Sequence, residues 1–534
     1  MINSITPNLL DCTLRDGGYY NNWNFSKSLI DDYLSKISKT NITHIELGFR
    51  FFKKDYPMGL TAYTDDKLIS SLNIPSNLSI GVMVNAADLK KNGLDPLTNL
   101  KKLFPKIHKR LDFVRFACHF DEVFILSKCV KWLKKNNIQV FINIMQISEI
   151  KKLEIQRICY FLKKTEVETL YIADSLGSLT SKSLIKIIKD FKKFWKKNLG
   201  LHAHNNLNLA LKNSLTAVKN NFKWIDCTIT GMGRGPGNLR TEDILIKYYP
   251  RDLLFIDKLK KNFFTLLKKK YKWGPNQYYK LAALYKIHPT YIQKMLSDSR
   301  FKKTNYTSIL KNLKKIDAKK FEPTKLYLGQ KHRSRKKVSI NNWSPRNLLN
   351  NKDILIFGPA ESVKNNKIKI EKFLKKKNLF VIGVNSSSGI NENLVNLRTI
   401  CHPRRFISDS SFLSKVKTPI IFPDSLIPLK LKKLINLKNK QVFDYDLKIS
   451  KKNIFNISNN SCEIPIPLVI IYTLAIVLTG KAKRIYVAGF DGFKDNNPNI
   501  DETNYLLNIF RKKYQLPTLK TITKSRYKIS QLKI

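Results

Sequence analysis

One feature constrains the fold of this chain more than any other. Short segments rich in β-branched residues alternate with longer, amphipathic, lysine-rich segments through the first 248 residues. Strands that alternate with helices along a chain form parallel β-α units. About eight units, repeating about every 30 residues, predict a closed (β/α)8 TIM barrel, and a doubly wound open sheet is the alternative. The expected strands are residues 8–14, 44–49, 78–85, 112–118, 139–147, 169–175, 199–205 and 224–231.

Three further parts are expected after a barrel domain of residues 1–248. Residues 249–315 predict a helical extension, residues 316–350 are basic and aperiodic and predict a linker, and residues 351–534 return to alternating strands and helices. Short strands that end in glycine or polar turns predict a smaller, Rossmann-like α/β domain there. The apolar run 464–480 is too short to span a membrane and contains two prolines, so it predicts a buried helix and no membrane span.

The charge balance of the chain is strongly basic. It carries 97 Lys and Arg against 40 Asp and Glu, a net charge of +57, which is typical of proteins that bind nucleic acids or membrane surfaces. The lysines are dispersed and no recognition motif accompanies them, so we interpret the charge as compositional drift and expect no specific nucleic-acid partner. The 7 cysteines form no CxxC pair and the N-terminus lacks a signal-peptide pattern, so a reducing, cytoplasmic location is expected.

Polar side chains gather at one end of the predicted barrel. Arg15 and Asp16 follow the first strand in "LLDCTLRDGG", where we expect a Gly-Gly turn, and Glu46 lies in the second strand. Active sites of (β/α)8 barrels lie at the carboxyl ends of the strands. The same end is expected to collect Asn85, Arg115, His119, Asn143, Gln146, Asp174, Ser175, His202 and His204.

The pair His202 and His204 is the best candidate for a metal site. The two residues are two apart on a strand, so both imidazoles point to one face. A hydrogen-bonded structural pair is one interpretation. The other is a divalent metal that takes a carboxylate from Asp16, because only strand eight separates strands one and seven in a closed barrel. Asn238 is a candidate for a further oxygen ligand, and such a set leaves positions open for a chelating substrate.

Three motifs make a family resemblance visible. The segments "DCTLRDGG", "GLHAHNNLNLALKNSL" and "TGMGRGPGNLRTE" together resemble the DRE-TIM metallolyase superfamily, the HMG-CoA lyase-like group that also includes pyruvate carboxyltransferase-type domains. The 4-hydroxy-2-oxovalerate aldolase branch is the most similar, and the resemblance extends over residues 5–300. It implies that Asp16, His202 and His204 bind Mn²⁺ or Mg²⁺, and that Asn238 matches a ligand of the lyase branch.

The same resemblance implies catalytic roles. Arg15 matches an arginine that stabilises an enolate oxygen, and Glu46 and Asp174 are expected to orient Arg15 or the ligands. The aldolase branch has a histidine three residues after the metal aspartate, whereas this chain has Tyr19, so Tyr19, Tyr20 or a water is left as the acid/base. A phenol is a weaker base at neutral pH, and Tyr19 as a pocket-lining residue is the alternative. Substrate contacts are expected from Asp174, Ser175, Gly233 and Arg234.

The second domain offers fewer signals. "ILIFGPAES" predicts a strand, a tight turn and a helix start, where backbone N–H groups could hold a phosphate, but it lacks GxGxxG. Together with "RIYVAGFDGF" it faintly resembles sialyltransferase-like Rossmann domains. A purely structural module is the alternative. The candidate residues are Gly358, Glu361 and Asp491.

The predicted activity follows from the barrel. We expect a divalent-metal-dependent aldolase that makes or breaks a carbon–carbon bond of a small 2-oxo acid through a pyruvate enolate. The protein is expected to form a homodimer. The reaction is expected to belong to surface-glycan or small-acid metabolism. One alternative is a Claisen-type acyl transferase that condenses acetyl-CoA with a 2-oxo acid. An alternative of another class is a basic, non-catalytic binding protein on a relic barrel.

Overall fold

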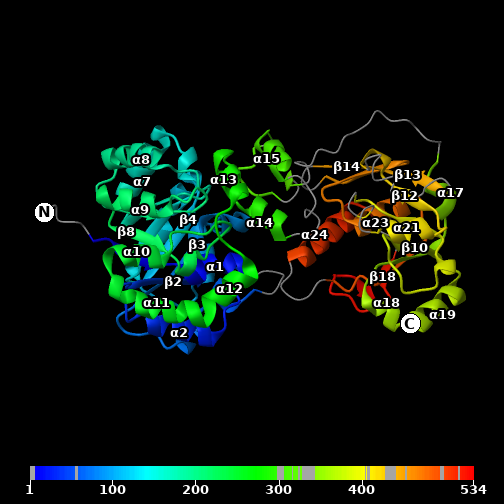
Figure 1. Ribbon diagram of the computed structural model, residues 1–534, viewed down its shortest axis with the longest axis horizontal. Helices are drawn as coiled ribbons and strands as arrows, with labels where there is room; N and C mark the ends of the chain where they lie inside the picture. The colour runs from blue at the N-terminus through cyan, green and yellow to red at the C-terminus, as the bar shows by residue number, and fades with distance from the viewer. Residues whose placement is uncertain are drawn as a thin grey trace. The chain divides into compact units, whose positions relative to one another are not determined.

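The protein consists of two compact units. The computed structural model describes residues 6–53, 58–297, 306–315, 317–322, 325–326, 343–402, 405, 409–426, 440–450, 454–492, 498–514 and 518–534. The first unit comprises residues 1–310 with 317–321, and the second comprises residues 311–316 with 322–534. Each unit is built around its own parallel sheet (Figure 1).

The first sheet is a closed barrel whose eight strands follow one another in chain order. All neighbours are parallel, and β1 closes the ring on β8 with Asn8 opposite Trp224. This confirms the predicted TIM barrel. The strands are β1 (Asn8–Asp11), β2 (His44–Phe49), β3 (Ser79–Asn85), β4 (Phe113–Cys118), β5 (Gln139–Ile144), β6 (Thr169–Ala173), β7 (Asn198–His202) and β8 (Trp224–Cys227).

Amphipathic helices cover the outside of the barrel. In α8 (Ser181–Phe194), Leu184, Ile188 and Phe191 share one buried face, while lysines occupy much of the rest. The Thr180 side chain accepts the N–H of Ser183 and caps the helix start. The other helices between or after strands include α2 (Lys27–Ile37), α5 (Pro96–Leu103), α6 (Ser127–Lys135), α7 (Lys152–Lys163), α9 (Ala210–Lys219) and α10 (Thr241–Tyr248).

The expectation of a Gly-Gly turn after a first strand of residues 8–14 is wrong. Strand β1 ends at Asp11, and helix α1 (Thr13–Asn21) contains both glycines. A Cβ atom at Gly17 would lie 2.7 Å from Met232 Sδ, and one at Gly18 would lie 2.1 Å from Trp23 Cδ1. The two glycines therefore allow close packing of α1 against neighbouring side chains, and the helix begins directly at the carboxyl end of β1.

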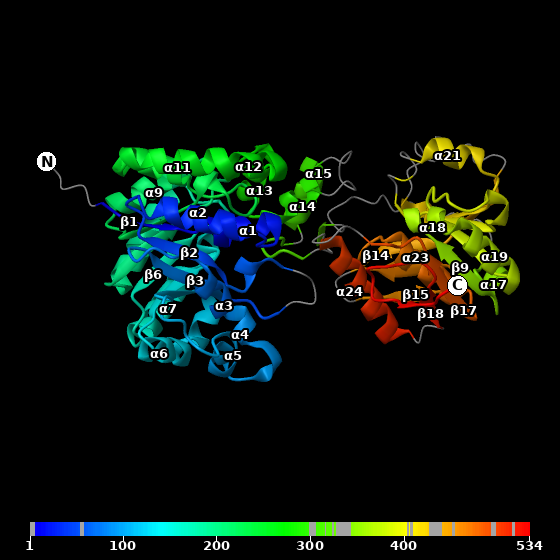
Figure 2. The ribbon, with the colours of Figure 1, turned by 90° about the horizontal axis from the view of Figure 1, so that it is seen from below.

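A helical extension follows the barrel, as predicted. Helix α11 lies beside α2 in both ribbon views (Figures 1 and 2). Of the expected linker 316–350, residues 316, 323, 324 and 327–342 lie outside the described residues. The extension contains α11 (Leu253–Leu259), the π-helical turn η7 (Lys260–Phe264), α12 (Thr265–Tyr271), α13 (Gln277–Leu284), α14 (Thr290–Ser297) and α15 (Tyr306–Lys315).

The second unit contains an open parallel sheet, which confirms a second α/β domain. Its strand order is β13-β12-β11-β10-β9-β17-β18-β19, beside a separate three-stranded sheet β14-β16-β15. The central strands are β9 (Asp353–Phe357), β10 (Phe380–Val384), β11 (Leu397–Thr399), β12 (Ile420–Phe422) and β17 (Arg484–Ala488). The outer strands are β13 (Val442–Asp444), β18 (Leu519–Thr521) and β19 (Ser530–Gln531), and the small sheet has β14 (Asp446–Ile449), β15 (Asn456–Ser458) and β16 (Ser461–Ile464).

The apolar run of the second unit forms a buried helix, α23 (Val469–Thr479), as expected. Nine of its residues are buried. Within the described part of the chain, no helix combines the length and the apolar character needed to cross a membrane.

Candidate metal centre

Three predicted ligands meet at the carboxyl end of the barrel. Asp16 lies on α1 just after β1, His202 is the last residue of β7, and His204 lies two residues further on. One ligand atom from each lies within 4.8 Å of the others, and all three residues are buried. The strand order explains the convergence, because β8 pairs with both β1 and β7.

Asp16 is held as a carboxylate. Arg15 Nη1 donates to Asp16 Oδ1 over 2.7 Å, Asn238 Nδ2 donates to Oδ2, and His202 Nε2 lies 3.6 Å from Oδ2. Burial raises the pKa of Asp16, but the charge of Arg15 and the interaction with His202 outweigh burial and hold the pKa well below its usual range. A negatively charged oxygen is therefore available to a cation at neutral pH.

His202 is oriented by a second carboxylate. Its Nδ1 lies 2.8 Å from Asp226 Oδ2, and Arg115 holds Asp226 through two bonds of 2.9 and 2.6 Å. Burial lowers the pKa of His202, but the interactions with Asp16 and Asp226 raise it above its usual value. An imidazole whose Nδ1 is bonded to a carboxylate presents Nε2 to a metal.

Asp226 was not among the predicted site residues. It is the only carboxylate in the apolar strand "WIDC". A lone charged residue in a buried strand needs a partner, and this pattern could have indicated a site residue. Together with Cys12 and His202 it forms a second buried group of potential ligand atoms that shares His202 with the first group.

Two buried polar atoms at the centre lack hydrogen bonds. Among the described residues, His204 Nδ1 and Asn238 Oδ1 have no partner. Burial and the nearby charge of His202 lower the pKa of His204 to about 3, so its imidazole is neutral. A carboxylate, two imidazoles and an amide oxygen are ligands suited to Mn²⁺ or a similar divalent ion, and the residues present fit such a metal.

Arg15 lies beside the candidate metal ligands, and one nitrogen of its guanidinium is not hydrogen-bonded to any described residue. Its Nε donates to Glu46 Oε2 over 2.6 Å, and Glu46 Oε1 lies 3.4 Å from Nε of Arg115. Arg15 Nη2 has no hydrogen-bond partner within the described ranges. Burial lowers the pKa of Arg15, but Glu46 and Asp16 together raise it well above its usual value, so the guanidinium stays charged.

Tyr19, Gly233 and Arg234 surround this cluster. The Arg234 guanidinium carbon lies 3.7 Å from the centroid of the Tyr19 ring, which also contacts Trp23. A Cβ atom at Gly233 would lie 2.8 Å from Asp16 Oδ2, so glycine allows the loop to approach the carboxylate. Their roles in catalysis and substrate binding stay predictions.

Asp174 and Ser175 organise the loop after β6. Asp174 Oδ1 accepts the N–H of Ser178 over 2.9 Å, and Oδ2 accepts the N–H of Leu179 over 3.2 Å. Burial raises the pKa of Asp174 to about 7. Ser175 Oγ accepts the N–H of Gln146 over 3.1 Å. These bonds give both residues local partners, and their predicted contact with substrate stays a prediction.

The candidates of the second unit lie around the ends of β9 and β17. Gly358 packs against the backbone of β17's turn, where a Cβ atom would lie 2.5 Å from Gly489 O. Asp491 accepts bonds from the N–H and the hydroxyl of Ser362 in α18 (Glu361–Asn365), and Glu361 is exposed. A ligand role for these residues stays a prediction.

The barrel carries, at the carboxyl ends of its strands, a donor set that fits a divalent metal. Residues 6–256 match the family model HMGL-like, and this part of the chain is an HMGL-like (DRE-TIM) domain of the metal-dependent lyases and transferases.

Similar proteins agree with this assignment. A 4-hydroxy-2-oxovalerate aldolase from Rhodococcus jostii is 24% identical over 236 residues, which cover 44% of this chain and 66% of that protein. One from Spirochaeta aurantia is 27% identical over 255 residues, covering 46% and 71%. The chain thus spans about two thirds of these relatives. The crystal structure of the N-terminal domain of a proposed aldolase from Bacteroides vulgatus is 29% identical with a TM-score of 0.51, over 57% of this chain and 99% of that domain.

Proposed function

We propose that the barrel is a divalent-metal-dependent aldolase that cleaves or forms the C3–C4 bond of a 4-hydroxy-2-oxo acid. The observation that carries the proposal is the convergence of Asp16, His202 and His204 beside the uncommitted donor of Arg15. The names of the matched relatives support this substrate class. Homodimer formation, a cytoplasmic location and the choice of Mn²⁺ stay predictions.

The reaction needs charge stabilisation where the bond breaks. Cleavage removes the proton of the 4-hydroxyl, releases an aldehyde and leaves the electron pair on a three-carbon enolate, which a proton converts to pyruvate. A divalent ion held by Asp16, His202 and His204 supplies Lewis-acid polarisation of the 2-oxo acid when it is bound. Arg15 Nη2 then donates to the oxygen that becomes negative, and Glu46 and Asp16 keep that guanidinium in place.

Tyr19 is our candidate for the proton acceptor. Its ring is fixed between Trp23 and Arg234, so Tyr19→Phe removes only the hydroxyl and keeps the ring contacts. We expect this variant to lose most of its kcat while KM changes little, because proton transfer is lost and binding is kept. An unchanged kcat would assign Tyr19 to the pocket wall instead.

The proposed function is tested with the full-length protein, Mn²⁺ and 4-hydroxy-2-oxovalerate, with pyruvate release as the readout. We expect turnover in the wild type and none above background in His202→Ala. The matched control is His108→Ala, which removes an imidazole bonded to Ser70. No pyruvate from the wild type with any 4-hydroxy-2-oxo acid, or full turnover in His202→Ala, would contradict the proposal. Thiol release from acetyl-CoA with a 2-oxo acid would favour the acyl transferase.

A further inference from the structure

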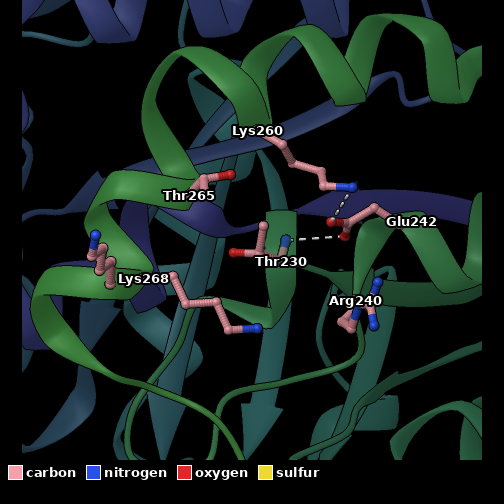
Figure 3. Close-up of a pocket in the computed structure, with 7 residues that line it drawn as sticks. Thr230, Arg240, Glu242, Lys260, Thr265 and Lys268 are labelled. Carbon is pink, nitrogen blue, oxygen red and sulfur yellow. Dashed lines mark hydrogen bonds and ion pairs between the residues drawn. The ribbon is translucent and has the colours of Figure 1, made fainter.

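A basic pocket lies outside the candidate metal centre. A cavity of about 320 Å³ separates the segment of η7 and α12 from the loop after β8 and the start of α10. Figure 3 shows Lys260 and Lys268 on the first segment, and Thr230, Arg240 and Glu242 on the second. These lining residues are different from the three metal ligands.

The pocket concentrates positive charge. Arg240, Lys260, Lys268 and Lys269 line it against the single carboxylate of Glu242. Arg240 and Lys260 have partners, since Arg240 Nε lies 3.5 Å from Asp243 and Lys260 Nζ lies 2.8 Å from Asp257.

Two of these lysines have no such partner. Lys268 and Lys269 have no ion pair with any residue that the structure describes. Burial lowers the pKa of Lys268, and the charges of Arg240 and Lys260 lower it further. Because neither lysine has an ion pair within the described residues, both ammonium groups can attract an anion from solution.

Glu242 adds an acceptor in the same pocket. The residue is 3% exposed, and its Oε2 accepts the N–H of Thr230 over 3.0 Å. Its Oε1 lies 3.7 Å from Lys260 Nζ and has no hydrogen bond within the described part of the chain. A buried carboxylate oxygen in this position can accept a hydroxyl of a ligand whose anionic group binds the lysines.

We propose that this pocket binds a small phosphate ester that carries hydroxyl groups, a molecule of the sugar-phosphate class. Lys268, Lys269 and Arg240 bind the phosphate, and Glu242 Oε1 accepts a hydroxyl. Two independent observations support the assignment, namely the unpaired lysines and the buried oxygen without a hydrogen bond.

Such a ligand would contact the loop that carries Asn238. Thr230 has a left-handed φ of 55°, and the next residue, Gly231, accepts the N–H of Asn238 over 3.2 Å. Trp273 Nε1 donates to Thr230 O over 3.2 Å. A bound ligand therefore stabilises the wall from which Asn238 reaches Asp16.

The test measures binding of glucose 6-phosphate and inorganic phosphate to the full-length protein by calorimetry at fixed ionic strength. We expect glucose 6-phosphate to bind more tightly than phosphate. Lys268→Gln/Lys269→Gln should weaken binding about ten-fold or more, because two charge-assisted contacts are lost. Glu242→Gln should reduce the advantage of glucose 6-phosphate over phosphate.

A second lysine-rich surface provides the control. Four lysines of α8, Lys186, Lys189, Lys192 and Lys193, line another cavity together with Lys196, and its single acidic residue, Asp190, is partly buried. Lys192→Gln/Lys193→Gln removes the same charge and should leave both affinities unchanged. Equal weakening by the two double variants, or equal affinity for the two ligands in the wild type, would overturn the proposal. None of these readouts requires aldolase activity, so they stand or fall independently of the proposed function.

Discussion

Two fully buried arginines, one in each unit, show what separates a candidate active site from a structural network. Arg115 on β4 binds Asp226 through two bonds, and Asp226 in turn holds His202. Arg398 on β11 donates to the backbone oxygens of Asn385 and Ser387 after β10. The network of Arg115 ends on a metal-ligand candidate, whereas that of Arg398 ends on a loop.

The carboxylate partners of the two arginines differ in the same way. Asp226 is 1% exposed, whereas the side chain of Glu392, the partner of Arg398, is 36% exposed. The acid of the Arg115 pair thus contacts an imidazole of the candidate metal centre, whereas the acid of the Arg398 pair is partly exposed. This comparison favours the barrel as the catalytic unit, and substitutions in both units can test it.

The largest expected effect follows loss of the charged ligand. Asp16→Asn should abolish Mn²⁺ binding and reduce pyruvate release to background, because the centre loses its only carboxylate among the three grouped ligands. Electron paramagnetic resonance of added Mn²⁺ measures binding directly. In the second unit, Asp353→Asn removes the ion pair with Arg484 and should leave both readouts unchanged. Retained Mn²⁺ binding in Asp16→Asn would place the metal elsewhere.

The next effect concerns stability. Arg115→Met leaves the buried Asp226 without its guanidinium partner, and should reduce the free energy of unfolding by about 3–5 kcal/mol. Arg398→Met should cost less, because Glu392 is partly hydrated.

Urea unfolding combined with regional hydrogen exchange assigns each loss to its unit. We expect faster exchange in the barrel strands for Arg115→Met and in β10 and β11 for Arg398→Met. Equal losses, or faster barrel exchange in Arg398→Met, would contradict the comparison.

A smaller effect is expected from the residue that orients His202. Asp226→Asn should weaken Mn²⁺ binding about 10- to 100-fold, since the carboxylate partner of a ligand histidine fixes its orientation. Asp11→Asn is the matched control, because Asp11 is equally buried on β1 but accepts bonds from Tyr33 and Thr241 and none from an imidazole. The control should lose stability and keep its metal affinity. Weakened metal binding in both variants would assign the effect to general loosening of the barrel.

The barrel could be predicted because each strand and each helix has its own local sequence pattern, and the two patterns alternate along the chain. Asp16, His202 and His204 were found because they lie in recognisable motifs at strand ends. Asp226 was missed, since it lies within an apolar strand and its partner Arg115 is 111 residues away. Only the closed ring brings such residues together.

The second unit was harder to predict for a different reason. Strands such as β13 and β18 have three residues each, too few to show a period of two. The end of β1 was misplaced because two glycines after a strand usually indicate a turn, while here the packing of Met232 and Trp23 requires them inside a helix. Local propensity did not contain that tertiary contact.

The smallest effect is expected from two ion pairs of the first unit whose lysines are partly exposed, in contrast to the buried ion pair of Arg115 and Asp226. Glu149, in η4 (Ile147–Glu149) after β5, contacts Lys286 at 2.7 Å and Lys319 at 2.5 Å, and both lysine side chains are nearly half exposed. Glu149→Gln should reduce the free energy of unfolding by about 1 kcal/mol or less, because water and salt screen such pairs.

The pH dependence of this last effect has a definite sign. Burial raises the pKa of Glu149, but the bonds from Lys286 and Lys319 outweigh it and hold the pKa below the ordinary 4.5. A depressed carboxyl pKa stabilises the folded state above the unfolded pKa, and this contribution disappears as pH falls through the folded pKa. The stability difference between wild type and Glu149→Gln should therefore be constant near neutral pH and shrink below about pH 4.5. A difference that grew on acidification would show that Glu149 is stabilised as the neutral acid, contrary to its two lysine contacts.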